Sequence, residues 1–347
     1  MRNSVIAACT ALLAAFGIAG VGGHEAAIGS PPTRTPYRIT RVPLPGDGRG
    51  DYILADARTR RLYVTHSASV HILDLDTLRT IGEVTGLRKA HGVAIAGGRG
   101  FASDGPANAV IVFDPSTGRT LSRIAAGRNP DSILFDRPSG MVFAFNGDSQ
   151  DVTVIDPASE RIVRTIALGD KPETARSDGR GRIFVNLEDQ HAIAVIDARA
   201  GTVVARYVLA DCEGPAALEF DPASRRLFSS CGNGVMKVVD ADSGRIVASL
   251  PVSRDSDGIS FDRARRRIYV AGRDGRWTII DQSGPDRYAV NRILPVDEYA
   301  KTTALDPRTG RVFSSTADLV WPPAAPGSAV LPNARPGSFR LVVVSGR

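Results

Sequence analysis

The sequence predicts an all-β protein that folds as a seven-bladed β-propeller of four-stranded antiparallel blades. The first observation is a set of aromatic residues that recur every 38 to 44 positions: Tyr63, Phe101, Phe143, Phe184, Phe228, Tyr269 and Phe313. Each of them lies in a short apolar stretch that follows an Asp-led turn. A repeat of about 40 to 45 residues with several short strands is typical of a propeller blade. Seven repeats therefore predict one closed ring.

The second observation is an apolar run that ends in Asp later in each repeat. It is found at Asp74, Asp114, Asp156, Asp197, Asp240 and Asp281. A turn follows each run, and it is clearest at 114–119, 240–245 and 306–311, where Ser or Thr precedes Gly and Arg. A turn carboxylate accepts backbone N–H groups, Pro presets φ, and Gly supplies a left-handed residue. We therefore expect these Asp residues to shape turns rather than to bind calcium or catalyse a reaction.

The repeat motif resembles a known family. Arg61-Leu-Tyr-Val-Thr-His66 and Arg267-Ile-Tyr-Val-Ala271 are similar to the motif of YVTN-type seven-bladed propellers, relatives of the bacterial YncE-like secreted proteins. The resemblance extends from about residue 37 to the C-terminus and implies the same ring fold. It does not imply one activity, because the superfamily includes binding proteins, haem d1 carriers and lactonases.

The two ends of the chain predict how the ring closes. Residues 37–45 match the outer strand of the internal repeats, and Phe339 to Val344 match a third strand. The N-terminal strand should therefore complete the last blade, so that residues 37–347 form one propeller without unpaired edges. A Pro-rich insertion at 317–338, which includes Trp321, should run as a stiff loop. It could cover the channel mouth, contact a partner or serve only as a spacer.

The N-terminus predicts export. Arg2 precedes an apolar segment from Val5 to Val21 and small residues that reach Gly23, which is the layout of a signal peptide. We expect cleavage between about residues 19 and 29, a disordered leader up to Pro36, and a secreted or periplasmic product without a membrane span. A retained anchor is the alternative. In an oxidising compartment Cys212 and Cys231 should form a disulfide, with a reactive thiol pair as the alternative.

Charge and motifs exclude several function classes. The net charge of +6 comes almost wholly from arginines scattered over the turns, and there is no basic helix or aromatic platform, so we do not expect nucleic acid binding. The sequence contains no GxSxG elbow, HExxH pair or Walker loop. Two tryptophans are too few for a quinoprotein-type propeller.

A column of ionisable residues is the candidate site. A different turn, the one just before each aromatic landmark, begins at equivalent positions such as Asp56 and Asp136. Counting back five residues from the start of this turn in each repeat gives a set of positions at one end of the channel: Asp51, His91, Asp131, Glu173, Ala216, Asp257 and Lys301. Carboxylates that converge around one imidazole could bind a divalent cation or a cationic ligand, and their mutual repulsion would raise some pKa values. His91, Asp51, Asp131 and Asp257 are the possible metal ligands.

A second loop on the same face adds candidates three residues beyond each aromatic landmark, namely His66, Asp104 and Asn146. We expect His66 and His91 to form an imidazole pair with Asp51 or Asp104. Oxygen ligands suit Ca²⁺ or Mg²⁺, whereas two imidazoles with a carboxylate suit Zn²⁺, copper or iron. The alternative is that all these polar groups cap strand ends and line a water-filled channel.

These observations favour a monomeric binding or interaction protein that presents its polar channel mouth to a small molecule, a metal or an envelope protein. No cofactor beyond a divalent metal is expected. One alternative is a lactonase-like hydrolase in which a metal polarises a lactone carbonyl and activates water, with Asp51, Asp131, Glu173, Asp257 and His91 as ligands or general base. Another is a structural scaffold of an envelope complex.

Overall fold

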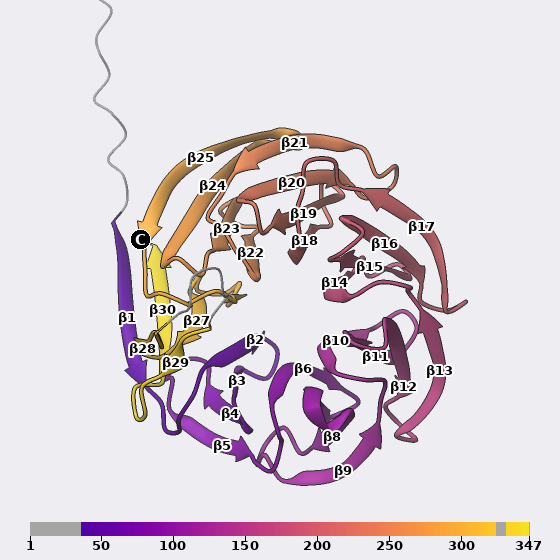
Figure 1. The fold of residues 1–347 in the computed structure, drawn as a ribbon, viewed down its shortest axis with the longest axis vertical. Helices are drawn as coiled ribbons and strands as arrows, with labels where there is room; N and C mark the ends of the chain where they lie inside the picture. The colour runs from indigo at the N-terminus through magenta and orange to yellow at the C-terminus, as the bar shows by residue number, and fades with distance from the viewer. Residues whose placement is uncertain (1–35, 324–330, 347) are drawn as a thin grey trace, which may run out of the picture. The chain divides into compact units, whose positions relative to one another are not determined.

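The computed structural model describes residues 36–323 and 331–346, which contain seven four-stranded antiparallel sheets arranged in a ring (Figure 1). The predicted signal peptide at 1–29 lies outside the described residues. The seven-bladed propeller predicted from the repeat is confirmed. Among the described residues, no helix is long and apolar enough to cross a membrane.

Each of the first six blades consists of four consecutive strands, with the first strand innermost (Figure 1). Blade 1 contains β2 (Gly50–Asp56), β3 (Arg61–His66), β4 (Ser69–Asp74) and β5 (Thr80–Val84). Blade 2 contains β6 (Ala90–Ala96), β7 (Arg99–Asp104), β8 (Ala109–Phe113) and β9 (Thr120–Ala125). Blade 3 contains β10 (Pro130–Asp136), β11 (Met141–Asn146), β12 (Asp151–Asp156) and β13 (Arg161–Ala167). A short 3₁₀ helix at Gly105–Ala107 joins β7 to β8.

The next three blades follow the same order. Blade 4 contains β14 (Pro172–Ser177), β15 (Arg182–Leu187), β16 (Ala192–Asp197) and β17 (Thr202–Val208). Blade 5 contains β18 (Pro215–Asp221), β19 (Arg226–Cys231), β20 (Val235–Asp240) and β21 (Ile246–Pro251). Blade 6 contains β22 (Gly258–Asp262), β23 (Arg267–Ala271), β24 (Arg276–Gly284) and β25 (Arg287–Pro295).

The last blade combines both ends of the chain, as the sequence predicts. Its strands are β26 (Ala304–Leu305), β27 (Val312–Thr316), β30 (Arg340–Gly346) and β1 (Tyr37–Pro43), in that order from the channel outwards. β1 pairs with β30 from Tyr37 opposite Gly346 to Pro43 opposite Arg340. The outer strand is shorter than the predicted 37–45, and β30 begins one residue later than predicted and reaches Gly346. The N-terminal strand therefore removes the edge that β30 would otherwise expose.

The insertion in the last blade differs in part from the expected strandless loop. β28 (Leu319–Val320) pairs with β29 (Asn333–Ala334). Neither two-residue segment contains Pro, so their backbone groups are available for pairing. Trp321 is 56% exposed, and its ring lies edge-on to that of Tyr299 at a centroid distance of 6.2 Å.

The core lies between neighbouring blades. The aromatic landmarks all lie on the second strand of their blade and are at most 1% exposed. Phe228 of blade 5, for example, packs against Phe261 of blade 6 with ring centroids 5.4 Å apart. Because each blade buries its apolar faces against its two neighbours, the ring grows without one oversized core.

The prediction of a turn after Asp281 is wrong, because this residue lies inside β24 opposite Ala289 and pairs with Arg267 at 2.6 Å. The other five Asp residues and the two cysteines behave as predicted. Asp114 accepts hydrogen bonds from the Ser116 N–H at 2.7 Å and the Ser116 hydroxyl at 2.5 Å, and these bonds lower its pKa. Gly118 completes the turn with a φ of +80°, which favours glycine. Cys212 and Cys231 form a disulfide with Cα atoms 5.3 Å apart, which ties the loop before β18 to the end of β19.

Candidate functional site

The predicted column lies at one end of the channel because its members occupy equivalent places at the start of the inner strands. Four of them begin inner strands, whereas Asp257 and Lys301 lie in the segments just before β22 and β26. Hydrogen bonds and ion pairs join most of these side chains into one charged cluster. We call Asp51, His91, Asp131, Glu173, Asp257 and Lys301 the column cluster.

His91 lies between two carboxylates. Its Nδ1 is 2.8 Å from Asp51 Oδ2 and 3.2 Å from Asp131 Oδ1, and its side chain is only 7% exposed. Burial lowers the pKa of His91, but the neighbouring carboxylates of Asp131 and Asp51 outweigh it and raise the pKa to about 9. At neutral pH the imidazolium therefore provides a positive charge between two acidic groups.

Lys301 supplies the next positive charge around the channel. Its Nζ is 3.5 Å from Asp51 Oδ1 and also binds Asp257, which Arg273 contacts at 2.8 Å. Burial raises the pKa of Asp51, but Lys301 and His91 hold it well below its usual range. Burial likewise opposes the ionisation of Asp257, and Lys301 and Arg273 still lower its pKa. Both aspartates are therefore charged at neutral pH.

Glu173 titrates differently from the other carboxyl groups. Burial and the nearby charge of Asp131 raise its pKa to about 8, although Lys171 lies 2.9 Å from its Oε1 and counteracts them. The like-charge effect expected from the sequence is therefore found at Glu173. A carboxyl group with a pKa close to neutral can both accept and donate a proton.

Asp131 leaves one carboxylate oxygen without a hydrogen bond. Its Oδ1 is buried and has no hydrogen-bond partner in the described part of the chain, although it lies 3.2 Å from His91 Nδ1. The hydrogen bond of that nitrogen goes to Asp51. Ligand atoms of Asp51, His91 and Asp131 lie within 4.8 Å of one another, which is the spacing of a metal site.

The second predicted set does not join the cluster. The His66 ring stacks on Phe339 at a centroid distance of 3.8 Å and on His71 at 5.5 Å, so the expected pairing of His66 with His91 is wrong. The prediction failed because His66, at the end of β3, packs against Phe339, which lies just before β30. Its ring also lies against Gly46, where an added Cβ would be 2.5 Å from His66 Cε1.

Asp104 and Asn146 bind groups of their own blades. Asp104 is fully buried and accepts hydrogen bonds from the backbone N–H groups of Arg88 and Lys89 at 3.0 Å. The Asn146 amide donates to Asp151 at 2.7 Å and to the Thr153 hydroxyl at 2.9 Å. Asp104 therefore binds the segment before β6, and Asn146 binds the neighbouring strand β12.

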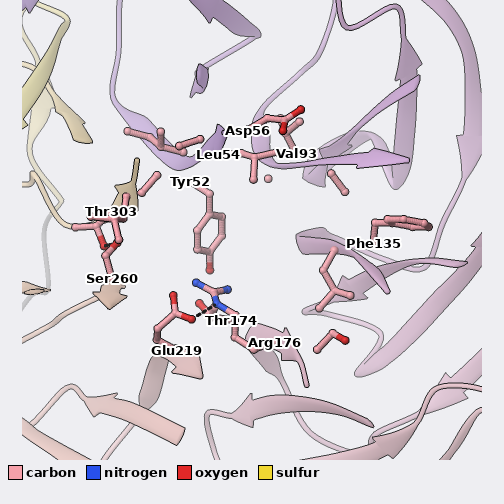
Figure 2. Close-up of a pocket in the computed structure, with 18 of the residues that line it drawn as sticks. Tyr52, Leu54, Asp56, Val93, Phe135, Thr174, Arg176, Glu219, Ser260 and Thr303 are labelled. Atoms are coloured by element: carbon pink, nitrogen blue, oxygen red, sulfur yellow. Dashed lines mark hydrogen bonds and ion pairs between the residues drawn. The ribbon is translucent and has the colours of Figure 1, made fainter. Parts of the chain in front are cut away.

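Sequence reasoning missed Tyr52, the residue after Asp51. Figure 2 shows its ring projecting from β2 into the channel towards Thr174 and Arg176 on β14. Burial and the charges of Asp131, Glu173 and Asp51 raise its pKa well above the usual value, so Tyr52 lies close to the column cluster. It also lines a cavity of about 1080 Å³ in the channel. No repeat pattern could reveal it, because only one blade carries a tyrosine at this position.

A smaller recess lies where the column lacks an ionisable residue. Ala216 lines a cavity of about 520 Å³ together with Asp257 and Arg273 of blade 6 and Glu188 of blade 4. The short Ala216 side chain leaves this part of the rim open. A small polar ligand could therefore reach the cluster from this side.

Comparisons with known proteins support the fold alone. No family model matches the sequence, and no curated protein matches it either. Among solved structures, the Kuenenia stuttgartiensis hydrazine synthase is similar with a TM-score of 0.68 and 18% identity, over 79% of this chain and 94% of that one. The WD40 repeats of RRP9 give a TM-score of 0.74 and 8% identity over 89% and 97% of the chains. U3-55K gives 0.74 and 7% over 88% and 98%.

The fold and these similarities define the chain as a seven-bladed β-propeller. At identities below 20% they carry no activity over to this chain.

Proposed function

We propose that this chain is an exported binding propeller that holds a divalent cation through Asp51, His91 and Asp131. The observation that carries the proposal is the buried Asp131 oxygen without a hydrogen bond inside a group of three closely spaced ligand atoms. In the absence of a cation, the protonated imidazole supplies the positive charge that the two carboxylates need. A metal ion would supply that charge directly and release the proton.

The donor set favours Zn²⁺ over Ca²⁺. One imidazole nitrogen and two carboxylate oxygens leave room for water or a ligand in the fourth position of a tetrahedral site. Ca²⁺ prefers six to eight oxygen ligands, which Asp51, His91 and Asp131 by themselves do not provide. Asp257, which the sequence placed among the possible ligands, is engaged by Lys301 and Arg273, so we assign it to the neighbouring recess.

Titration of the metal-free protein with ZnCl₂ in a calorimeter tests the proposal. We expect saturable binding of one Zn²⁺, which His91→Gln and Asp131→Asn weaken by more than the roughly 10- to 100-fold that loss of an outer-shell partner typically causes. His191→Gln is the matched control, because His191 is exposed and lies outside the cluster. Circular dichroism establishes that each variant is folded. Failure of the parent protein to bind Zn²⁺, or equal affinity in His91→Gln, contradicts the proposal.

Export is part of the same proposal. The signal-like N-terminus, the resemblance to YncE-like secreted propellers and the disulfide between Cys212 and Cys231 support it. Recovery of the chain only from the cytoplasmic fraction, with both thiols reduced, would contradict it.

A metal-dependent hydrolase of the lactonase type is the second candidate, favoured by Glu173. Its pKa of about 8 suits a general base or acid near neutral pH, and a bound cation would polarise a carbonyl. We expect such an enzyme to hydrolyse members of a lactone panel, to lose this activity in chelator and to lose it in Glu173→Gln with Zn²⁺ binding intact. A protein that binds Zn²⁺ without any lactone turnover is a binding protein only.

A further inference from the structure

The channel contains a large cavity whose lining residues lie mostly outside the column cluster. Its volume of about 1080 Å³ exceeds that of many small-molecule sites. The lining runs along the inner strands from Tyr52 to the turns that follow them at Arg58, Arg137 and Arg263. The cavity therefore opens at the end of the channel opposite to the column cluster. Tyr52, which reaches across the channel in Figure 2, lies at its inner end.

Three arginines give the open end a positive rim. Arg58, Arg137 and Arg263 come from blades 1, 3 and 6, and each is exposed. In residues 36–323 and 331–346 none of them forms an ion pair, whereas many other arginines of the protein do.

Carboxylates close to the rim are already engaged within their turns. Asp56 accepts from the Arg58 N–H at 3.0 Å and from the Thr59 hydroxyl at 2.6 Å. Asp262 pairs with Arg265 at 2.7 Å. Anions that approach this end therefore meet guanidinium groups that form no ion pair with a carboxylate in the described part of the chain.

The wall of the cavity carries apolar side chains behind this rim. Half-buried side chains from different inner strands form it, notably Leu54, Ile95, Phe135 and Leu305. Further in, Arg176 and Glu219 form an ion pair at 3.4 Å (Figure 2). Because that pair is neutral as a unit, the inner end attracts an anionic head group less than the rim does. The cavity thus has a cationic opening and an interior in which apolar side chains alternate with hydroxyl groups, such as those of Thr174 and Ser260, and with the Arg176–Glu219 pair.

We propose that this channel binds an amphiphilic anion, a carboxylate with an unbranched apolar tail, whose head contacts Arg58, Arg137 and Arg263 and whose tail extends towards Tyr52. The site is separate from the proposed metal site, and neither depends on the other. Guanidinium groups bind carboxylates through paired N–H donors, and burial of the tail contributes about 25 cal/mol per Å² of apolar area.

Calorimetric titration of the full chain with decanoate, decanol and decylammonium below their aggregation concentrations tests the proposal. We expect decanoate to bind, decanol to bind at least tenfold more weakly, and decylammonium to show no saturable binding. The triple variant Arg58→Gln/Arg137→Gln/Arg263→Gln should weaken decanoate at least tenfold and leave decanol unchanged.

A matched triple variant separates a specific site from general charge. Arg79, Arg161 and Arg245 are also exposed, lack an acidic partner in the described part of the chain, and lie at outer strands or their turns. Their replacement by Gln removes the same charge and should leave decanoate affinity unchanged. Equal losses in both triple variants would overturn the proposal. So would the absence of decanoate binding when vesicles of phosphatidylglycerol still bind, which would assign the rim to a membrane surface. Zn²⁺ affinity, measured in parallel, should be the same in both variants.

Discussion

Deletion of residues 37–45 is expected to leave a protein that does not form a stable monomeric ring. This segment contains β1, which pairs with β30 over seven positions and packs Tyr37 edge-on against Tyr269 at 6.3 Å. Arg41 also pairs with the nearly buried Asp297 at 3.0 Å. Without β1, the backbone of a strand that contains Leu341-Val-Val-Val344 becomes an exposed edge, which is a template for aggregation.

Size-exclusion chromatography and thermal unfolding measure this effect. We expect the deletion variant to elute as aggregate or to melt at a much lower temperature than the parent. Addition of a synthetic peptide of residues 36–45 should restore part of the stability, whereas a scrambled peptide should not. A deletion variant with the melting temperature of the parent would show that the last blade does not need its outer strand.

The second large effect is a loss of stability in mild acid, caused by the stacked pair His66 and His71. Burial and, to a smaller extent, the charge of the neighbouring His71 lower the pKa of His66 to about 4, although Glu83 opposes them. Burial also lowers the pKa of His71. His66 Nε2 and both ring nitrogens of His71 are buried without a hydrogen bond in the described part of the chain, and the carboxylate near His71 Nδ1, Glu83 Oε1, is 3.7 Å away, so an additional proton on either ring would gain no close acceptor.

The sign of the effect follows from the lowered pKa values. Well above the ordinary histidine pKa of about 6.5, both histidines are neutral in the folded and the unfolded chain, so they have no pH-dependent effect. As the pH falls towards 4, the unfolded chain gains protons that the folded protein excludes, and the free energy of unfolding decreases. For His66 alone this loss amounts to about 3 kcal/mol at pH 4.

Denaturant unfolding at pH 7 and pH 4.5 checks this prediction. His66→Phe keeps an aromatic ring on Phe339 and removes the titrating group, so this variant should lose less stability than the parent between the two pH values. His191→Gln, which changes an exposed histidine, should lose as much as the parent. Parallel pH profiles for the parent and His66→Phe would contradict a role of His66.

The repeat made most of the fold predictable. Phe143 and Tyr269 recur with the blade period because every blade needs a large apolar side chain at the same interface. Such a period can be recognised from the spacing of residues alone, without knowledge of the contacts that they make. The disulfide followed from two cysteines near equivalent ends of one blade. The column followed for the same reason, because a fixed offset from the turn Asp identifies the start of each inner strand.

The site was predictable as a set of positions but not as a set of contacts. The sequence placed His66 and His91 in neighbouring loops, and the structure directs His66 towards Phe339 instead. The sequence also predicted Asp257 as a possible metal ligand, but in the structure Asp257 forms ion pairs with Lys301 and Arg273. In both cases a side chain found a partner from a segment with no fixed offset in the repeat.

By itself, the sequence determined the number of blades, the closure of the ring by the N-terminal strand, the disulfide and the row of ionisable residues at one end of the channel. All of these depend on spacing along the chain, which can be read from the repeat period of the sequence. Only the tertiary structure decided which charges pair, which carboxyl group keeps its proton, and that a cavity with an arginine rim opens at the other end. Contacts such as that between Arg60 and Asp306, 246 positions apart, depend on distances of a few ångströms across the closed ring, which spacing along the chain does not encode.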